Sequence, residues 1–472
     1  MQVLQSKTLG IRKCFIYLVA ALIVFMVSSR LFTETFGLLP KIVDVINYPF
    51  FVLTLSATVF CLFFRGACLK KFELILVVGF ALLIISFLGN VATVYFPAFV
   101  LYVAGFYEGP LIFFVLTRLV GKDYGSSLLI QKTFLYLILI NIAVVIFVSY
   151  PLYISSGGNP DLLSGTFGAN AYYFSIFLVA SLGAGVGLFY ERRIGVGILF
   201  AFVSFVVGTF FLLQYRAALP FFLVVVFVFI YFMYSRNALR IFSVLGLLAV
   251  AAVSVVYMLD SLFDNSDRLK YGDFLDILDD PYFILQFGKF QSYAATMDMW
   301  GDEIANFFLG VGPGNYTSRS YYTFSYEFLI KDGSGVSGII REYLGQTQPR
   351  FSPYDLEYIS NFRSEIVFGS YQLSNPNSSY LTLLGELGFF GGFVGILLYF
   401  WLLLFSLGNL KESLRRHSSV GICAFAFCGT FFVFLLGFLD NYWEMARATL
   451  FIWVANWASF ASLQDQHRGR KF

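Results

Sequence analysis

Long apolar runs separated by short polar connections make up most of the sequence, and one long polar stretch interrupts them. A helix that crosses a bilayer needs about 20 mainly apolar residues. By this measure the sequence predicts twelve membrane-spanning helices, at 14–33, 47–64, 72–90, 98–119, 132–150, 172–190, 194–213, 217–235, 240–258, 380–405, 420–438 and 447–463. The interrupting stretch, 260–379, is expected to form one large loop between the ninth and tenth spans.

The pattern therefore divides the chain into nine spans in 1–259, a large loop in 260–379, and three spans with a tail in 380–472. The least regular of the predicted spans lies in 91–119, where Pro97, Glu108 and Pro110 interrupt the apolar residues. Irregular backbone at membrane depth is tolerated only where protein or water satisfies its polar groups. A broken or re-entrant helix is therefore the alternative to a regular span there.

The composition agrees with a polytopic membrane protein. Only 12% of the 472 residues are charged and 59% are hydrophobic, whereas a soluble domain carries about 25% charged residues. The 60 Phe and 30 Tyr residues suit lipid-facing helices and interfacial belts. The formal net charge of +3 gives no sign of a nucleic-acid partner. We expect an all-α fold embedded in a lipid bilayer.

Lys and Arg residues mark one side of the predicted membrane protein, because cytoplasmic loops carry an excess of them. They fall in alternate short loops, at Arg65, Lys70, Lys71, Arg118, Lys122, Arg192, Arg193, Arg236, Arg240, Lys411, Arg415 and Arg416. The N-terminus and the tail are basic too, whereas 151–171 has neither Lys nor Arg. Twelve spans would place both termini in the cytoplasm and the large loop outside. The five cysteines all lie outside that loop, so an exported domain held by disulfides is excluded.

Four stretches on the predicted outer side of the membrane resemble motifs of the O-antigen ligase and polymerase superfamily, in the order of that family. SGTFGAN at 164–170 is similar to its Gly-Thr-Phe-x-x-Asn turn, and LQYRAAL at 213–219 to its Ser-Arg-Gly-Ala-Leu turn. FLGVGPGNY at 308–316 resembles its Gly-x-Gly-x-Gly stretch. NSSYLTLLGELGFFG at 377–391 resembles its His-Asn-x-Tyr-Leu-x-Leu-Leu-x-Glu-x-Gly-x-x-Gly motif. Together the four motifs cover 38 residues.

The resemblance implies a GT-C-like fold and a glycosyltransferase that uses neither a metal ion nor another cofactor. Its donor and acceptor would be undecaprenyl-pyrophosphate-linked glycans at the periplasmic face of the bacterial inner membrane. The chain looks most like a Wzy-type polymerase, for which a chain-length regulator protein is a candidate partner. The alternatives are an O-antigen ligase, with lipid A core as acceptor, and a transporter or flippase of lipid-linked sugars. We find no internal repeat of the kind that marks many transporters.

Three residues are the candidates for catalysis. Arg216 lies in a short outer turn between two predicted spans, where a guanidinium can bind two oxygens of a diphosphate. The alternative is an arginine that only extends from a helix end to the interface. Asn377 and Ser378 occupy the positions at which the family motif has His-Asn. Since an Asn amide is not a base at neutral pH, the expected mechanism depends on neutralising the leaving diphosphate.

The substrate-binding candidates are polar residues of the same outer turns and of the large loop. They are Asn170, Arg319, Arg341, Arg363, Tyr380 and Glu386. For Asn170 a helix N-cap is an equal alternative. Other polar residues at outer helix ends are interpreted as structural: Arg30, Arg447, Asp440, Asn441, Trp443 and Glu444. Both histidines, His417 and His467, fall on the predicted cytoplasmic side, so no imidazole is expected near the donor.

Overall fold

The computed structural model describes residues 2–40, 43, 47–62, 70–168, 170–213, 218–234, 288–325, 336–358 and 378–464. Three predicted site residues, Arg216, Arg363 and Asn377, lie outside the described residues, as does the predicted span 240–258. Every other predicted span coincides with a helix, and the described residues contain no strand.

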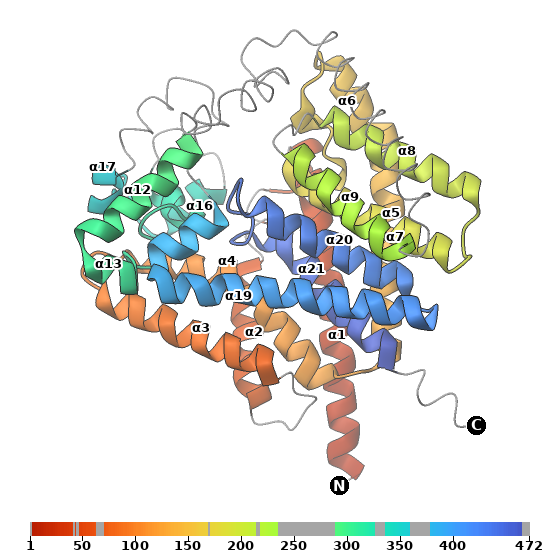
Figure 1. The fold of residues 1–472 in the computed structure, drawn as a ribbon, viewed down its shortest axis with the longest axis horizontal. Coiled ribbons are helices and arrows are strands. Elements are labelled where there is room, and N and C mark those ends of the chain that lie inside the picture. Colours follow the sequence, from red (N-terminus) through yellow and green to blue (C-terminus); the bar gives the residue numbers. More distant parts are fainter. Residues whose placement is uncertain are drawn as a thin grey trace.

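The helices pack into a bundle, and several short elements lie between the long helices along the chain (Figure 1). Their bounds are α1 (Gln2–Arg30), η1 (Leu31–Thr35), α2 (Asn47–Leu62), α3 (Lys70–Gly89), α4 (Phe96–Val115), η3 (Leu116–Val120), α5 (Tyr124–Val144), η4 (Val145–Ser149), α6 (Tyr150–Ser155), η5 (Pro160–Leu162), η6 (Gly165–Phe167), α7 (Ala171–Tyr190), α8 (Val196–Leu212), α9 (Leu219–Tyr234), α12 (Gly288–Asp302), α13 (Ile304–Leu309), α14 (Arg319–Phe324), α16 (Val336–Tyr343), α17 (Pro353–Tyr358), α19 (Ser379–Arg416), α20 (Val420–Leu436) and α21 (Ala446–Gln464).

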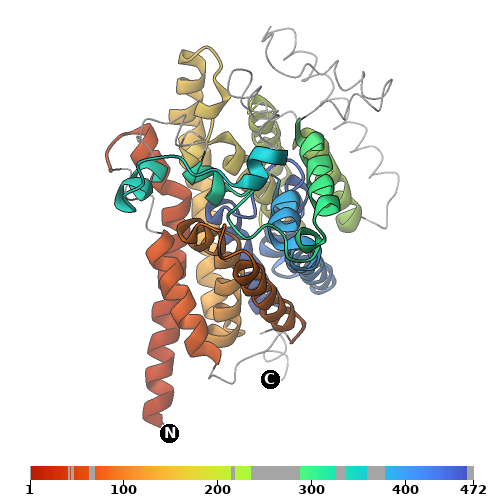
Figure 2. The same cartoon turned by 90° about the vertical axis from the view of Figure 1, so that its left-hand side faces the viewer.

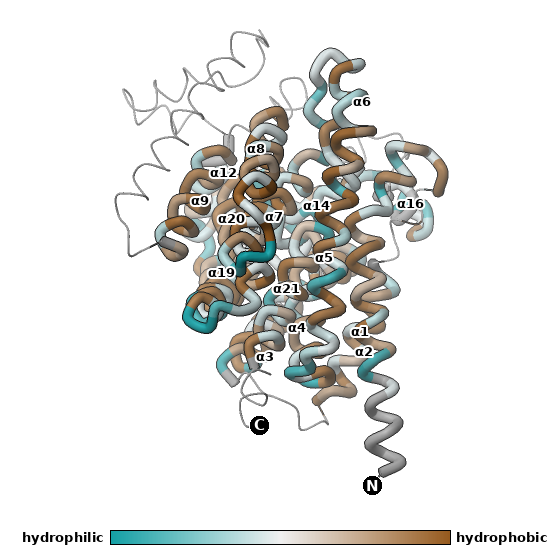
Figure 3. The backbone as a smooth tube through the Cα atoms, turned by 90° about the vertical axis from the view of Figure 1, so that its right-hand side faces the viewer, coloured by the Kyte–Doolittle hydropathy of each residue, from teal (hydrophilic) through white to brown (hydrophobic). Residues whose placement is uncertain are grey.

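Within the described residues, six helical stretches are long and apolar enough to cross a membrane. They are Arg12–Thr35, Lys71–Gly89, Phe96–Val120, Tyr124–Ser155, Ala171–Tyr190 and Ser379–Arg416. Shorter apolar helices are Tyr48–Leu62, Val196–Leu212, Leu219–Met233 and Val420–Leu436. Hydrophobic residues predominate along the helices, and strongly hydrophilic residues gather at helix ends and turns (Figure 3). The expected all-helical membrane-protein class is therefore present, while the number of twelve spans stays a prediction.

The irregular stretch at 91–119 forms a helix that is not broken at its prolines. The α4 helix begins at Phe96 and continues through Pro110 to Val115. Pro97 lies in its first turn, where a missing N–H costs no helical hydrogen bond. Gly105 and Gly109 let α4 approach the α21 region closely, because a Cβ on Gly109 would lie 2.2 Å from Cδ1 of Trp453. Pro97 thus marks the start of a helix and not a break within one.

Close helix packing holds the middle of the bundle together. Figure 1 shows α20 and α21 at its centre, with α3 and α19 on one side and α5 to α9 on the other. Small residues allow α7 and α20 to meet: a Cβ on Gly183 would lie 2.5 Å from the Ala424 carbonyl oxygen, and one on Gly187 would lie 2.7 Å from Cα of Gly421. Small residues are common at helix contacts in membranes because they permit this approach.

The two ends of the bundle differ in the contacts that they contain. At the basic end, Nε of Arg118 lies 2.6 Å from Oε1 of Glu73, and Nε1 of Trp457 donates to the Gly121 carbonyl at 3.1 Å. The described helices of the large loop lie away from the N-terminal end of α1 (Figure 2). Part of the predicted large loop packs inside the protein, because residues 310–318 are all buried and backbone contacts join them to α19.

Candidate functional site

The start of α19 is fixed by the hydroxyl of Ser378, one of the predicted catalytic residues. Ser378 is 1% exposed and is the N-cap of α19, with its Oγ accepting from the Leu381 N–H at 3.4 Å. The same Oγ donates to the Gly437 carbonyl at 2.8 Å and lies 2.5 Å from Oη of Tyr293. Its geometry is that of a helix cap, and a catalytic role for it stays a prediction.

The next two residues attach α19 to the turn between α20 and α21. Ser379 Oγ donates to the Asp440 carbonyl at 3.2 Å and accepts from the Trp443 N–H at 3.1 Å. Tyr380 is 6% exposed, and its Oη donates to the Phe434 carbonyl at 3.0 Å. The structure thus brings the 377–391 motif against the polar turn at 437–445, whose polar residues the sequence analysis interpreted as structural.

Glu386 holds the glycine-rich stretch in place from inside the protein. Its side chain is fully buried. Oε2 accepts from the Gly314 N–H at 2.5 Å, and Oε1 accepts from the N–H groups of Tyr316 at 2.9 Å and Ser318 at 2.8 Å. Two motifs that are some seventy residues apart in sequence therefore meet around one carboxyl group. The contacts are to backbone, and a contact of Glu386 with substrate stays a prediction.

The glycines of this stretch are needed for the close approach. Gly310, Gly312 and Gly314 have φ angles of +69°, +95° and +77°, a region that other residues seldom adopt. A Cβ on Gly310 would lie 2.4 Å from the carbonyl of Glu386. The Val311 N–H donates to the Gly385 carbonyl at 3.1 Å. The stretch is thus a tight turn against α19.

Glu444 performs a similar task at the start of α14. Its Oε2 accepts from the Arg319 N–H at 2.6 Å, and its Oε1 accepts from the Ser320 N–H at 2.8 Å. Burial raises the pKa of Glu444, and the hydrogen bonds from the backbone of Ser320 and Arg319 oppose that increase. Glu386 and Glu444 together hold the backbone from 314 to 320. Arg319 and Ser320 are the last two residues of this stretch.

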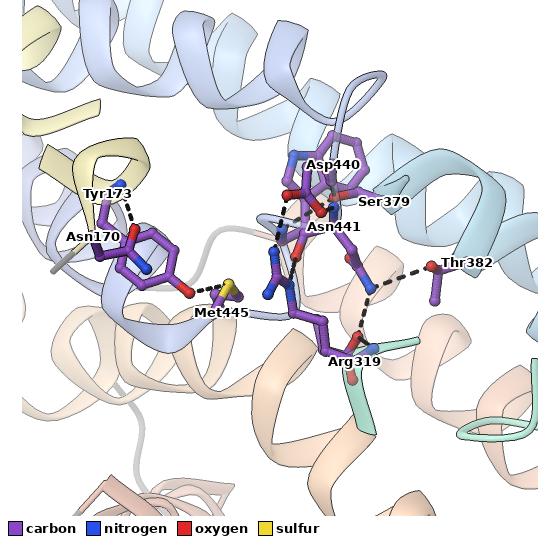
Figure 4. A network of polar contacts seen from close by, with 10 residues as sticks. Asn170, Tyr173, Arg319, Ser379, Thr382, Asp440, Asn441 and Met445 are labelled. Carbon is purple, nitrogen blue, oxygen red and sulfur yellow. Dashed lines mark hydrogen bonds and ion pairs between the residues drawn. The ribbon is translucent and has the colours of Figure 1, made fainter. Parts of the chain in front are cut away.

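The guanidinium of Arg319 faces the turn between α20 and α21 (Figure 4). Nη2 lies 3.0 Å from Oδ2 of Asp440, and Nε donates to the Asn441 carbonyl at 3.3 Å. Burial would lower the pKa of Arg319, but the combined electrostatic effect of Asp440, Tyr173, Tyr442 and Glu444 outweighs burial and raises the pKa. The side chain is 32% exposed, and no hydrogen bond engages its Nη1 among the described residues. Arg319 is thus a permanent cation with part of its surface open.

Asn170 caps α7 beside the turn at 164–168. Its Oδ1 accepts from the Tyr173 N–H at 3.2 Å. In the turn, the N–H and Oγ1 of Thr166 both donate to Oδ1 of Asn141, at 3.0 and 3.1 Å. Gly168 has a φ of +69°, and a Cβ there would lie 2.6 Å from Cβ of Arg30. The capping alternative describes the geometry of Asn170, and substrate contact stays a prediction.

Two further arginines lie near the same turn. The guanidinium carbon of Arg30 is 5.7 Å from the centroid of the Tyr173 ring, and Nη1 of Arg447 donates to Oγ of Ser29 at 3.0 Å. Tyr173 is also close enough to Arg319 to act on its charge, and Figure 4 shows Met445 between them. Tyr173, in the first turn of α7, thus lies close to both Arg30 of α1 and Arg319 of α14, while Arg447 of α21 is bonded to the end of α1. The sequence signal was that Arg30 and Arg447 lie at predicted outer helix ends and that Arg319 lies in the predicted large loop.

The remaining predicted residues are not joined to this cluster by any contact described above. Arg341 lies in α16 and is 4% exposed, with its carbonyl accepting from the Gln346 N–H at 2.9 Å. His417 stacks on Tyr190 at a centroid distance of 5.4 Å, at the basic end of the bundle. Within the described ranges, no group of three or more His, Cys, Asp and Glu residues is arranged to hold a metal ion.

No protein-family model matches the sequence, and no curated protein matches it either. The resemblance to the ligase and polymerase superfamily therefore stays an expectation from the four motifs. Three of them have described residues at the site: the turn at 164–170 lies against Arg30, and the stretches at 308–316 and 377–391 meet at Glu386. The fourth motif contains Arg216, which is outside the described residues.

Proposed function

We propose that the protein is a membrane glycosyltransferase similar to the Wzy-type polymerases. It joins undecaprenyl-pyrophosphate-linked oligosaccharide repeat units into O-antigen or a related surface polysaccharide. In this proposal both termini are cytoplasmic, and the large loop and the site lie at the periplasmic face of the inner membrane. The observation that supports it most is the partly open guanidinium of Arg319, which lies close to Tyr173, a residue whose ring Arg30 also approaches.

The chemistry needs little more from the protein than positioning and positive charge. The acceptor hydroxyl attacks the anomeric carbon of the donor glycan, the bond from that carbon to the diphosphate oxygen breaks, and the hydroxyl proton leaves to water or to the released diphosphate. Cationic groups aimed at the developing charge are often the largest contribution to such catalysis. We assign that role to Arg319, and Arg216 stays a further candidate.

The first test replaces Arg319 in cells that lack the native gene. Arg319→Ala should give surface glycan of single repeats, because the leaving diphosphate loses its cation. Arg319→Lys keeps the charge but loses the planar two-pronged geometry, so it should be strongly impaired as well. The measurement is the glycan ladder on a gel, with membrane abundance of each variant measured beside it. A full ladder from Arg319→Ala at normal abundance would remove Arg319 from the mechanism.

A structural role of Arg319 is tested by its ion-pair partner. Asp440→Asn removes the negative charge 3.0 Å from Nη2 while leaving the guanidinium in place. If Arg319 only stabilises the turn, Asp440→Asn and Arg319→Ala should damage the ladder equally. If Arg319 binds the donor, Asp440→Asn should keep long chains. Arg193→Ala is the matched control, because this arginine is 66% exposed at the basic end and should not matter.

The type of glycan defect separates this proposal from its two alternatives. Loss of a polymerase leaves one repeat on the lipid A core, since the ligase still attaches single units. Loss of a ligase removes the surface attachment while lipid-linked polymer still forms. Loss of a flippase leaves the lipid-linked precursor on the cytoplasmic side.

A further inference from the structure

The α13 helix is apolar although it belongs to the polar large loop. Its sequence, IANFFL, contains no charged residue. Ile304 is 75% exposed and Phe308 is 44% exposed. The preceding residues Asp302 and Glu303 are also exposed but charged. The chain therefore changes from charged to apolar surface between Glu303 and Ile304.

The exposed face of α13 continues onto the apolar faces of two helices that are long enough to cross a membrane. Phe308 stacks on Phe390 of α19, with ring centroids 5.8 Å apart and an interplanar angle of 15°. Phe390 itself is 49% exposed. On the other side, Leu88 of α3 is 61% exposed, and a Cβ on Gly89 would lie 3.0 Å from Cδ1 of Leu309.

We propose that α13 is immersed in the outer leaflet of the bilayer, with its exposed face covered by lipid acyl chains. The continuity with α3 and α19 favours lipid as the occupant, because the exposed Leu88 and Phe390 beside α13 belong to helices long and apolar enough to cross a membrane. Apolar helix faces of this kind enter the boundary between headgroups and acyl chains. Asp302 and Glu303 then lie at the level of the headgroups. The inference holds whatever reaction the protein catalyses.

Immersion of α13 would fix the depth of the segment that follows it. Gly310 comes directly after the helix, with its N–H donating to the Asn306 carbonyl at 2.9 Å. Asn90, which follows α3, donates through Nδ2 to the Gly310 carbonyl at 3.0 Å. The stretch held by Glu386 begins here, so lipid around α13 would set the height of that stretch in the membrane.

The experiment measures whether lipid or water surrounds each labelled position in the reconstituted protein. Nitroxide labels are placed by Ile304→Cys and Phe308→Cys in full-length protein whose five native cysteines are replaced, in vesicles of phosphatidylethanolamine and phosphatidylglycerol. Collisions with oxygen, which enters the hydrocarbon, are compared with collisions with a water-soluble nickel chelate. Phe393→Cys on α19, where Phe393 is 49% exposed, is the lipid control, and Glu342→Cys on α16 is the water control.

At 304 and 308 we expect the oxygen-to-nickel ratio of the lipid control, several-fold above that of the water control. A ratio equal to that at 342 would overturn the proposal, and so would low collision rates with both reagents, since these mean that protein covers α13. Unmodified protein gives an independent measurement if the variants fail to fold. A carbene from a phospholipid tail should label peptides covering 304–309 and 389–393, and absence of label from 304–309 alone would also overturn the proposal.

Discussion

Replacing Glu386 by Gln tests whether this side chain organises the glycine-rich stretch. Gln keeps one acceptor oxygen, which can serve the N–H groups of Tyr316 and Ser318, both bonded to Oε1 in the native protein. The new amide nitrogen then faces the Gly314 N–H, donor against donor, where Oε2 accepted at 2.5 Å. A buried N–H left unsatisfied costs about 1–3 kcal/mol. A tenfold change in an equilibrium constant corresponds to about 1.4 kcal/mol. Local opening of the stretch should therefore become roughly 5- to 150-fold more frequent.

Hydrogen exchange followed by mass spectrometry measures that opening. In Glu386→Gln, amides in a peptide covering 310–320 should exchange faster by this factor, while peptides from α7 and α20 keep their rates. Glu412→Gln is the matched control on the same helix. Its carboxylate is 36% exposed and pairs with Arg416 at 2.6 Å, far along α19 from the glycine-rich stretch. Glu412→Gln should leave the exchange of 310–320 unchanged.

Two results would refute this reasoning. Native exchange rates at 310–320 in Glu386→Gln would mean that the three hydrogen bonds do not hold the stretch. Native rates together with a lost glycan ladder would show that Glu386 acts on substrate, as its sequence motif suggested. Glu386→Ala removes all three acceptor contacts and should open the stretch further than Gln does.

Three other predictions follow from the remaining contacts. A cysteine that replaces Glu342 should react with an impermeant thiol reagent in intact spheroplasts. A cysteine that replaces Arg415, whose side chain is 79% exposed, should not react. The reverse labelling pattern would invert the proposed orientation. Asn170→Asp keeps a capping oxygen for the Tyr173 N–H but adds a negative charge near the arginines, so thermal stability should persist while polymer length falls; unchanged length would leave Asn170 with capping alone. Burial raises the pKa of Glu444 from its ordinary value of 4.5, so the folded protein binds this proton more tightly than the unfolded chain. Stability should therefore fall as pH rises from about 4.5 through the raised pKa, and Glu444→Gln should weaken this slope in thermal inactivation measured from acid to neutral pH.

The helices were predictable from the sequence because lipid leaves the backbone little choice. Without water, each backbone N–H and C=O must find a partner within the segment, so an apolar run of sufficient length is a helix. The prolines at 97 and 110 suggested a break in this helix, but α4 continues through Pro110. Pro97 begins α4, and the sequence does not distinguish a proline in a first helical turn from one that breaks a helix.

The burial of the glycine-rich stretch was not predictable in the same way. Residues 310–318 lie in a polar loop and carry no apolar periodicity, yet they are buried because a carboxyl group on α19 satisfies their N–H groups. Such pairing depends on contacts between segments some seventy residues apart, which a local pattern cannot reveal. Arg30 and Arg447 were likewise interpreted as separate helix ends, and only the packing of α1 with α21 brings their surroundings together.

The division of work among the charged groups follows from what each one touches. Glu386 and Glu444 accept hydrogen bonds from backbone N–H groups, so they shape the stretch from 314 to 320. Arg319 lies at the end of that stretch and keeps part of its guanidinium open. A buried carboxyl that fixes the backbone beside an exposed cation is a means of preorganising the cation, which lowers the cost of reorganisation during reaction. If this is the arrangement, Glu386→Gln should lower the rate of polymerisation through Arg319, and a second substitution, Arg319→Ala, should add little to the loss. Full additivity of the two losses would instead assign Glu386 an independent task.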